Sequence, residues 1–158
     1  MSLPADLLSF LETTGEGRLV IACIGNALRS DDGFGPRLAA ELGARALRNT
    51  IVLDCGTTPE NQVGPIAREA PGAVLIVDAV HLGEAPGTMR LLGADEISRS
   101  GLTTHDLSPS MFLERLIASL PEGCRVRMLA VQPASVAFGE GLSGELEQAL
   151  SALLKLLW

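Results

Sequence analysis

Acidic side chains follow three apolar segments of the chain at the points where those segments end, and a histidine lies in a later loop. They are Asp31 and Asp32 after the first segment, Asp54 after the second, Asp78 after the third, and His105 before a helical pattern. A carboxylate can act as a general acid or base, and it can also bind a metal ion. Two carboxylates and one imidazole suit a divalent transition metal with open coordination positions.

Each of these residues also has a structural explanation. Aspartates at strand ends and helix starts commonly accept hydrogen bonds from free backbone N–H groups. We expect this role for Asp31, ahead of a helix that begins near Gly33. Several carboxylates in one crevice repel one another, however, and they need a cation or a raised pKa on one member to coexist. The group as a whole therefore indicates chemistry more strongly than any single member does.

The segments that position these residues alternate between two hydrophobic periods. Runs that are apolar on both faces predict central strands of a covered sheet, at residues 19–24, 50–53, 73–77 and 126–131. Apolar residues at helical spacing predict helices, at residues 34–46, 109–120 and 142–157. Two further elements are expected, an amphipathic helix at residues 2–13 and an antiparallel edge strand at residues 87–92.

This alternation predicts a single α/β domain over residues 1–158, with residues 18–158 as its core. We expect three layers, in which a mostly parallel, twisted sheet of about five strands has helices on both faces. In such folds ligands bind beyond the carboxyl ends of the strands. The aspartates and the histidine are therefore expected to converge at one edge of the sheet.

Composition excludes several classes of protein. With 47% hydrophobic and 20% charged residues and a mean hydropathy of +0.31, the chain is not of the disordered type. Twelve basic and 19 acidic side chains give a net charge of −7, which argues against a nucleic-acid partner. Without an apolar run of about 18 residues or a secretory signal, we expect a cytoplasmic protein with no membrane insertion. We expect it to be a monomer.

Other catalytic motifs are absent or incomplete. The segment after Ile24 lacks the lysine of a phosphate-binding loop, and Ala27 and Ser30 stand where a dinucleotide fingerprint needs glycine. Three cysteines are too few for a disulfide framework, and Cys23 is expected to be a buried core thiol. Cys55 remains a possible nucleophile, although nothing in the sequence places it beside a histidine.

Five segments occur in a characteristic order from about residue 19 onward. They are IGNALRSDDGFGP, LDCGTTPEN, LIVDAVHLGEAPGTMRLL, TTHDLSPSMFLERL and AVQP. Together they resemble the hydrogenase maturation endopeptidases, the nickel-dependent processing proteases of [NiFe]-hydrogenase large subunits. The resemblance is greatest to the branch that acts on hydrogenase 3 of formate hydrogenlyase, and it implies a five-stranded α/β fold.

The resemblance also implies a function and a set of site residues. The protein would be an aspartyl-type endopeptidase that removes a C-terminal extension from the large-subunit precursor after nickel insertion. The family's metal-contacting positions fall on Asp32, Asp78 and His105. Nickel would be carried by the precursor, because a site without cysteine should bind nickel more weakly than the precursor's cysteine cluster. Asp32 and Asp78 are also the candidate catalytic residues, with Asp54 as a nearby base or substrate-orienting carboxylate.

Three alternatives accompany this interpretation. His81 lies three residues after Asp78, but its surroundings predict a surface loop, and we rank it below His105 as a ligand. A non-catalytic, nickel-sensing chaperone could bind the precursor without cutting it. A small-molecule binding domain, in which the aspartates serve only as caps, is the third possibility.

Overall fold

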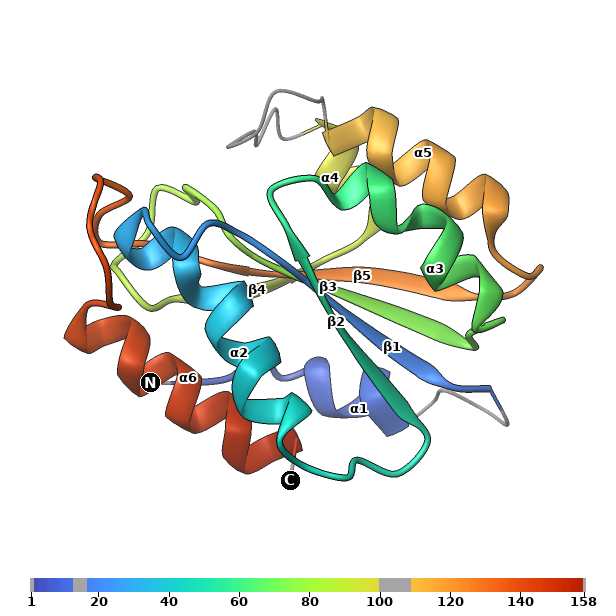
Figure 1. The fold of residues 1–158 in the computed structure, drawn as a ribbon, viewed down its shortest axis with the longest axis horizontal. Coiled ribbons are helices and arrows are strands. Elements are labelled where there is room, and N and C mark those ends of the chain that lie inside the picture. Colours follow the sequence, from blue (N-terminus) through green and yellow to red (C-terminus); the bar gives the residue numbers. More distant parts are fainter. Residues whose placement is uncertain (1, 13–16, 100–108, 158) are drawn as a thin grey trace.

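The structure is a computed structural model that describes residues 2–12, 17–99 and 109–157. Its centre is a five-stranded sheet in the order β2-β1-β3-β5-β4 (Figure 1). The strands are β1 (Leu19–Ile24), β2 (Thr50–Gly56), β3 (Ala73–Ala79), β4 (Met89–Leu92) and β5 (Arg125–Val131). All neighbouring strands are parallel except β4, which runs antiparallel to β5. The predicted sheet, including its antiparallel edge strand, is confirmed.

Helices cover both faces of the sheet, which gives the three predicted layers (Figure 1). One face carries α1 (Leu7–Glu12), α2 (Phe34–Gly43) and α6 (Gly144–Leu157). The other face carries α3 (Val63–Arg68), α4 (Ala94–Arg99) and α5 (Pro109–Ser119). Two short 3-10 helices, η1 (Ser30–Gly33) and η2 (Pro59–Gln62), precede α2 and α3.

The central strands are buried on both sides because their side chains alternate between two apolar clusters. Every residue of β1 and of β3 is buried. Ile21, Cys23 and Val77 face the cluster beneath α1, α2 and α6, whereas Ile24 and Ile76 face the cluster beneath α3, α4 and α5. A strand with both faces covered is therefore apolar throughout, which is the pattern that predicted it.

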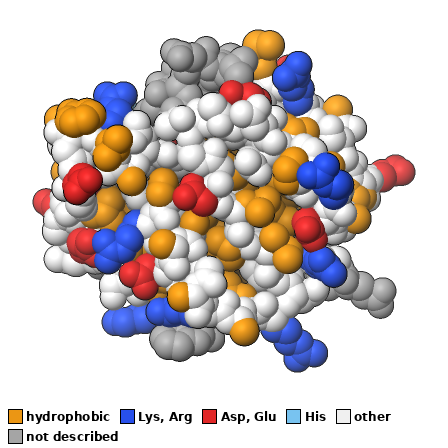
Figure 2. Space-filling view, viewed as in Figure 1, with side chains coloured by type: hydrophobic (Ala, Val, Ile, Leu, Met, Phe, Trp, Pro, Cys, Tyr) orange, Lys and Arg blue, Asp and Glu red, His pale blue; other side chains and the backbone are white. Residues whose placement is uncertain are grey.

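The remaining edge strand, β2, is less covered. Its residues Ile51, Val52 and Leu53 are only partly buried. On the face drawn in Figure 2, hydrophobic side chains gather near the middle, in the region that β2 crosses in Figure 1. None of the helices in the described part of the chain is long and apolar enough to span a membrane.

Three helices differ from the sequence-based expectation. The N-terminal helix was predicted from residue 2, but Pro4 disfavours helical conformation at Leu3, and residues 5–6 form a turn in which the Leu7 N–H donates to the Pro4 carbonyl oxygen at 3.1 Å, so that α1 begins at Leu7. The helices α3 and α4 were not predicted. Each has only six residues and buries a single side chain, Ile66 and Ile97 respectively, so neither shows a helical period.

The loops that follow β1, β3 and β5 come together at the carboxyl end of the sheet, on the left in Figure 1. The loop after β1 contains η1, and the chain after β5 runs through residues 132–143 to α6. This edge is where an open α/β sheet binds ligands.

Candidate functional site

Two buried carboxylates lie close together at this edge. Asp32 belongs to η1 and is 4% exposed, and Asp78 lies near the end of β3 and is 5% exposed. The pKa of Asp78 is raised well above its ordinary value of 3.8 by burial and, secondly, by the negative charge of Asp32, with a partly opposing hydrogen bond from the Ala79 backbone. The predicted convergence of these two aspartates is therefore present in the fold.

Asp32 is held by the turn that follows β1. The backbone N–H of Asn26 donates to Asp32 Oδ2 at 3.1 Å and to the Asp32 carbonyl oxygen at 3.0 Å. The Asn26 side chain in turn accepts a hydrogen bond from the N–H of Leu28 at 2.9 Å, which closes the turn. The Gly-Asn-Ala-Leu segment thus fixes the position of the first carboxylate.

Gly25 permits this close turn, and we expect Gly25→Ala to disrupt it. The residue has a φ of +149°, and a Cβ placed there would lie 1.9 Å from the Asp32 carbonyl oxygen. Because the contact is with backbone, η1 would have to move, so the free energy of unfolding should fall by at least about 2 kcal/mol. Urea denaturation measures this loss. Gly43→Ala is the control, since nothing lies within 4 Å of a Cβ at that position. An unchanged stability for Gly25→Ala would contradict the close approach.

Asp31 has a role different from the one predicted. It was expected to cap the helix near Gly33, but neither η1 nor α2 has a side-chain cap. Its fully buried carboxylate instead accepts hydrogen bonds from the segment that joins β5 to α6. The donors are the N–H groups of Ala134 at 2.8 Å, Ser135 at 3.3 Å and Ser143 at 2.7 Å, and the Ser143 hydroxyl at 2.9 Å. Asp31 therefore fastens the two loops together.

Asp54 lies on the other face of the sheet from Asp78. It pairs with Cys23 in register, and Cys23 belongs to the cluster beneath α2, whereas Asp78 alternates with Val77 and so faces the opposite side. Its side chain is exposed and accepts a hydrogen bond from the Gly56 N–H at 3.0 Å. A role for Asp54 as a base or an orienting carboxylate stays a prediction.

Of the two histidines, the structure describes His81 but not His105. His105 lies outside the described residues, so its place beside the carboxylates stays a prediction. His81 is exposed in the loop between β3 and β4, as expected.

Gln132 was not predicted as a site residue, although it is part of the AVQP segment. It is buried, and its Oε1 accepts hydrogen bonds from the N–H groups of Leu82 at 2.6 Å and Glu84 at 3.3 Å. Its backbone also pairs with Thr88 and Gly87. Gln132 therefore shapes the loop that follows Asp78. A glutamine directly after the apolar, buried second half of β5 is the signal that could have identified it.

The cysteine thiols are unsuited to nucleophilic attack. Burial, reinforced by the charge of Asp54, raises the pKa of Cys55 to about 12, and burial also raises the pKa of Cys23 and of Cys124. A thiol with such a pKa carries almost no thiolate near neutral pH, and the thiolate is the reactive form. As expected, Cys23 is fully buried.

The chemistry of the carboxylate pair fits a cation. A divalent ion replaces the proton that a raised pKa otherwise retains, and it removes the repulsion between the two aspartates. Within residues 2–12, 17–99 and 109–157, no three His, Cys, Asp or Glu side chains form a metal site. Asp32 and Asp78 therefore supply at most two protein ligands from this part of the chain, and they leave room for donors from elsewhere.

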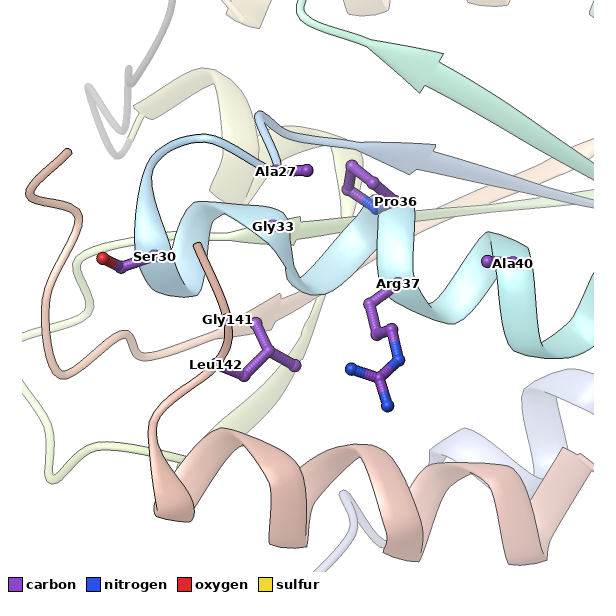
Figure 3. A pocket seen from close by; sticks show the side chains of 8 residues that line it. All are labelled: Ala27, Ser30, Gly33, Pro36, Arg37, Ala40, Gly141 and Leu142. Atoms are coloured by element: carbon purple, nitrogen blue, oxygen red, sulfur yellow. The ribbon is translucent and has the colours of Figure 1, made fainter. Parts of the chain in front are cut away.

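A pocket of about 260 Å³ lies beside η1, between α2 and the start of α6 (Figure 3). The side chains of Arg37 and Leu142 point into the space between these helices. The pocket is lined by Ala27, Ser30, Gly33, Pro36, Arg37, Ala40, Gly141 and Leu142. Arg37 is the one charged residue of this lining and forms ion pairs with Glu41 at 3.3 Å and Glu147 at 3.4 Å, so the pocket is largely apolar.

Comparisons of the sequence and of the structure with known proteins find relatives of one kind. A family model described as hydrogenase maturation protease matches residues 36–158. The hydrogenase 3 maturation protease of Escherichia coli K12 is 32% identical over 139 residues, which are 87% of each chain. The crystal structure of a [NiFe] hydrogenase maturation protease HycI from Thermococcus kodakarensis superposes with a TM-score of 0.84 at 28% identity, covering 97% of this chain and 96% of that one. The solution structure of the endopeptidase HycI from E. coli gives a TM-score of 0.77 at 31% identity, with 87% of each chain covered.

Proposed function

This chain belongs to the hydrogenase maturation proteases, and we propose that it removes a C-terminal extension from a [NiFe]-hydrogenase large-subunit precursor after nickel has been inserted. It is an endopeptidase, as its relatives are named, and the chaperone and small-molecule alternatives are therefore disfavoured. The observation that carries the proposal is the buried, electrostatically coupled pair of Asp32 and Asp78 at the carboxyl edge of the sheet.

Nickel enters this proposal as cargo of the substrate. Asp32 and Asp78, with His105 as a third ligand, would contact the ion that the precursor already holds. Neither Cys23 nor Cys55 is expected to offer a thiolate, because both side chains are buried and burial raises the pKa of each thiol. Carboxylates and imidazole compete poorly with a thiolate cluster for nickel. The protease would therefore contact the nickel ion without removing it from the precursor.

The raised pKa of Asp78 explains why the carboxylate pair would bind a nickel ion that the precursor brings. Without a cation, burial and, secondly, the negative charge of Asp32 raise the pKa of Asp78. A cation brought by the precursor would favour the charged form of both carboxylates and would be bound between them. Nickel so placed can polarise a carbonyl group or lower the pKa of an attacking water. Because Asp54 lies on the other face of the sheet from Asp78, it could orient only a part of the precursor that lies away from the carboxylate pair.

A processing assay tests the nickel requirement. Purified protein is mixed with nickel-loaded precursor or with the same precursor freed of nickel, and the products are weighed by mass spectrometry. We expect the loaded precursor alone to yield a shorter product. Equal cleavage of both forms would contradict the nickel requirement, and a stable complex without cleavage would favour a chaperone. We propose that the protein acts as a monomer in the cytoplasm, where precursor chains are synthesised.

Cys55→Ala should leave processing intact. Because the thiol is 3% exposed and its pKa is about 12, it offers no thiolate at neutral pH. We expect the rate of precursor cleavage to stay within about threefold of wild type, the change being limited to a small cavity. Iodoacetamide at pH 7.5 should likewise leave the native enzyme active. Loss of cleavage in a Cys55→Ala variant that is still folded would revive the cysteine-nucleophile alternative.

A further inference from the structure

Two exposed apolar side chains stand on the paired loops beside the carboxylate site. Phe138 is 85% exposed and Leu28 is 49% exposed. Their loops are joined next to these residues, because the N–H of Gly139 donates to the Leu28 carbonyl oxygen at 2.8 Å and Arg29 bridges to Gly139. In Figure 2, hydrophobic side chains protrude at the upper left, where these two loops lie in Figure 1. We call Leu28 and Phe138 the apolar pair.

Phe138 differs from the other phenylalanines of the chain. Phe10, Phe34 and Phe112 are at most 6% exposed and belong to the two apolar clusters. Aromatic side chains, including Phe, are enriched in the buried cores of protein interfaces, where each buries a large apolar area. The exposure of Phe138 therefore indicates a contact surface.

The loop that carries Phe138 is held in place by hydrogen bonds along its whole length. The Ser30 N–H donates to Gly139 at 2.7 Å, the Ser30 hydroxyl donates to Ala137 at 2.8 Å, and the Arg29 Nε donates to Val136 at 3.2 Å. The four hydrogen bonds to Asp31 fix both ends of the same loop. A side chain presented on a fixed backbone loses little conformational entropy on binding, which favours affinity.

We propose that the apolar pair docks into an apolar pocket on the large-subunit precursor and so places the precursor over Asp32 and Asp78. This inference rests on the proposed function. The occupant follows from continuity with the site, since Asp32 comes four residues after Leu28 in the same loop. A protein whose peptide reaches Asp32 must lie against this loop. The pocket in Figure 3, which Ala27 and Leu142 of these same loops help to line, offers a complementary hollow for a side chain of the precursor.

Steady-state cleavage of nickel-loaded precursor tests the proposal, with variants compared side by side. We expect Phe138→Ala to raise KM about 10- to 100-fold and to leave kcat within about twofold, because docking precedes the chemical step. Leu28→Ala should raise KM about threefold or more, and Phe138→Leu should recover part of the loss. The matched control is Leu8→Ala, which removes an equally exposed leucine, 49%, from α1, well away from these loops. Its KM should equal that of wild type.

Every other outcome would overturn the proposal, and each would do so for a different reason. If wild type cleaves the precursor and Phe138→Ala has the same KM, the docking role fails and the proposed function stands. If Phe138→Ala lowers kcat alone, the residue acts in the chemistry. If wild type cleaves nothing, the proposed function fails and this inference with it. If light scattering shows a wild-type dimer that Phe138→Ala separates, the occupant is a second copy of this chain. Thermal melting checks folding, and an 85% exposed side chain should not change Tm.

Discussion

Asp78→Asn is expected to slow processing of the large-subunit precursor by at least about 100-fold without unfolding the protein. The substitution keeps the size of the side chain but removes its negative charge, and with it half of the carboxylate pair that would receive the cation. Asp32→Asn should cause a loss of the same order. Single-turnover cleavage of nickel-loaded precursor, followed on a denaturing gel, gives the rates. Asp95→Asn, which changes an exposed carboxylate on α4, is the control and should cleave normally.

Asp78→Asn, which is expected to slow cleavage, is also expected to gain stability relative to wild type as the pH rises. A loss of cleavage with this pH dependence would therefore not be due to unfolding. The pKa of Asp78 in the folded state lies well above its ordinary value of 3.8, so the native protein retains a proton that the unfolded chain releases. Stability therefore falls as pH rises from about 4 toward the folded-state pKa. Asp78→Asn removes this dependence. Relative to wild type, its free energy of unfolding should gain more than about 1 kcal/mol between pH 4 and pH 7 in urea titrations. An Asp78→Asn variant whose stability relative to wild type stays the same between pH 4 and pH 7 would contradict the raised pKa of Asp78.

Asp31→Ala is expected to lower the free energy of unfolding by about 3–5 kcal/mol. Its carboxylate is fully buried and accepts four hydrogen bonds from Ala134, Ser135 and Ser143, so truncation leaves buried donors without an acceptor. The N-terminal end of α6 should loosen too, because Ser143 also accepts a hydrogen bond from the Leu146 N–H. Urea denaturation at pH 7 measures the loss.

A matched series isolates the contribution of these hydrogen bonds. Ser143→Ala removes one donor to Asp31 and should cost about 1 kcal/mol. Asp31→Asn keeps one acceptor oxygen but points an amide group at N–H donors, and it should fall between the other two variants. If Asp31→Ala lowers stability by less than about 1 kcal/mol, the carboxylate does not hold the loops together.

Much of the fold could be predicted because its strands have an unambiguous pattern. The predicted strand at residues 19–24 matches β1, since a strand covered on both faces is apolar at every position. The antiparallel strand β4 followed from a Pro-Gly turn ahead of a short apolar run. The helices α3 and α4 could not be predicted, since one buried side chain in six residues has no period.

The sequence could predict only those site residues whose location follows from their position along a strand. Asp32 follows β1 and Asp78 lies near the end of the neighbouring strand β3, and the parallel order of these strands brings both aspartates to one edge. The partners of Asp31 are 103 to 112 residues away, and no local pattern reveals a pairing over that distance. Asp54 also ends a strand, but its register with Cys23 places it on the opposite face, which the strand ending alone does not show.

The central claim, that Asp32 and Asp78 act as one unit on the precursor, is tested most directly by a double-mutant cycle. The rates of nickel-loaded precursor cleavage are measured for wild type, Asp32→Asn, Asp78→Asn and the double variant. Residues that act as a unit show losses that do not multiply. We expect the double variant to be no more than about threefold slower than the slower single variant. A double variant whose loss equals the product of the two single losses would show independent residues and would contradict a shared site.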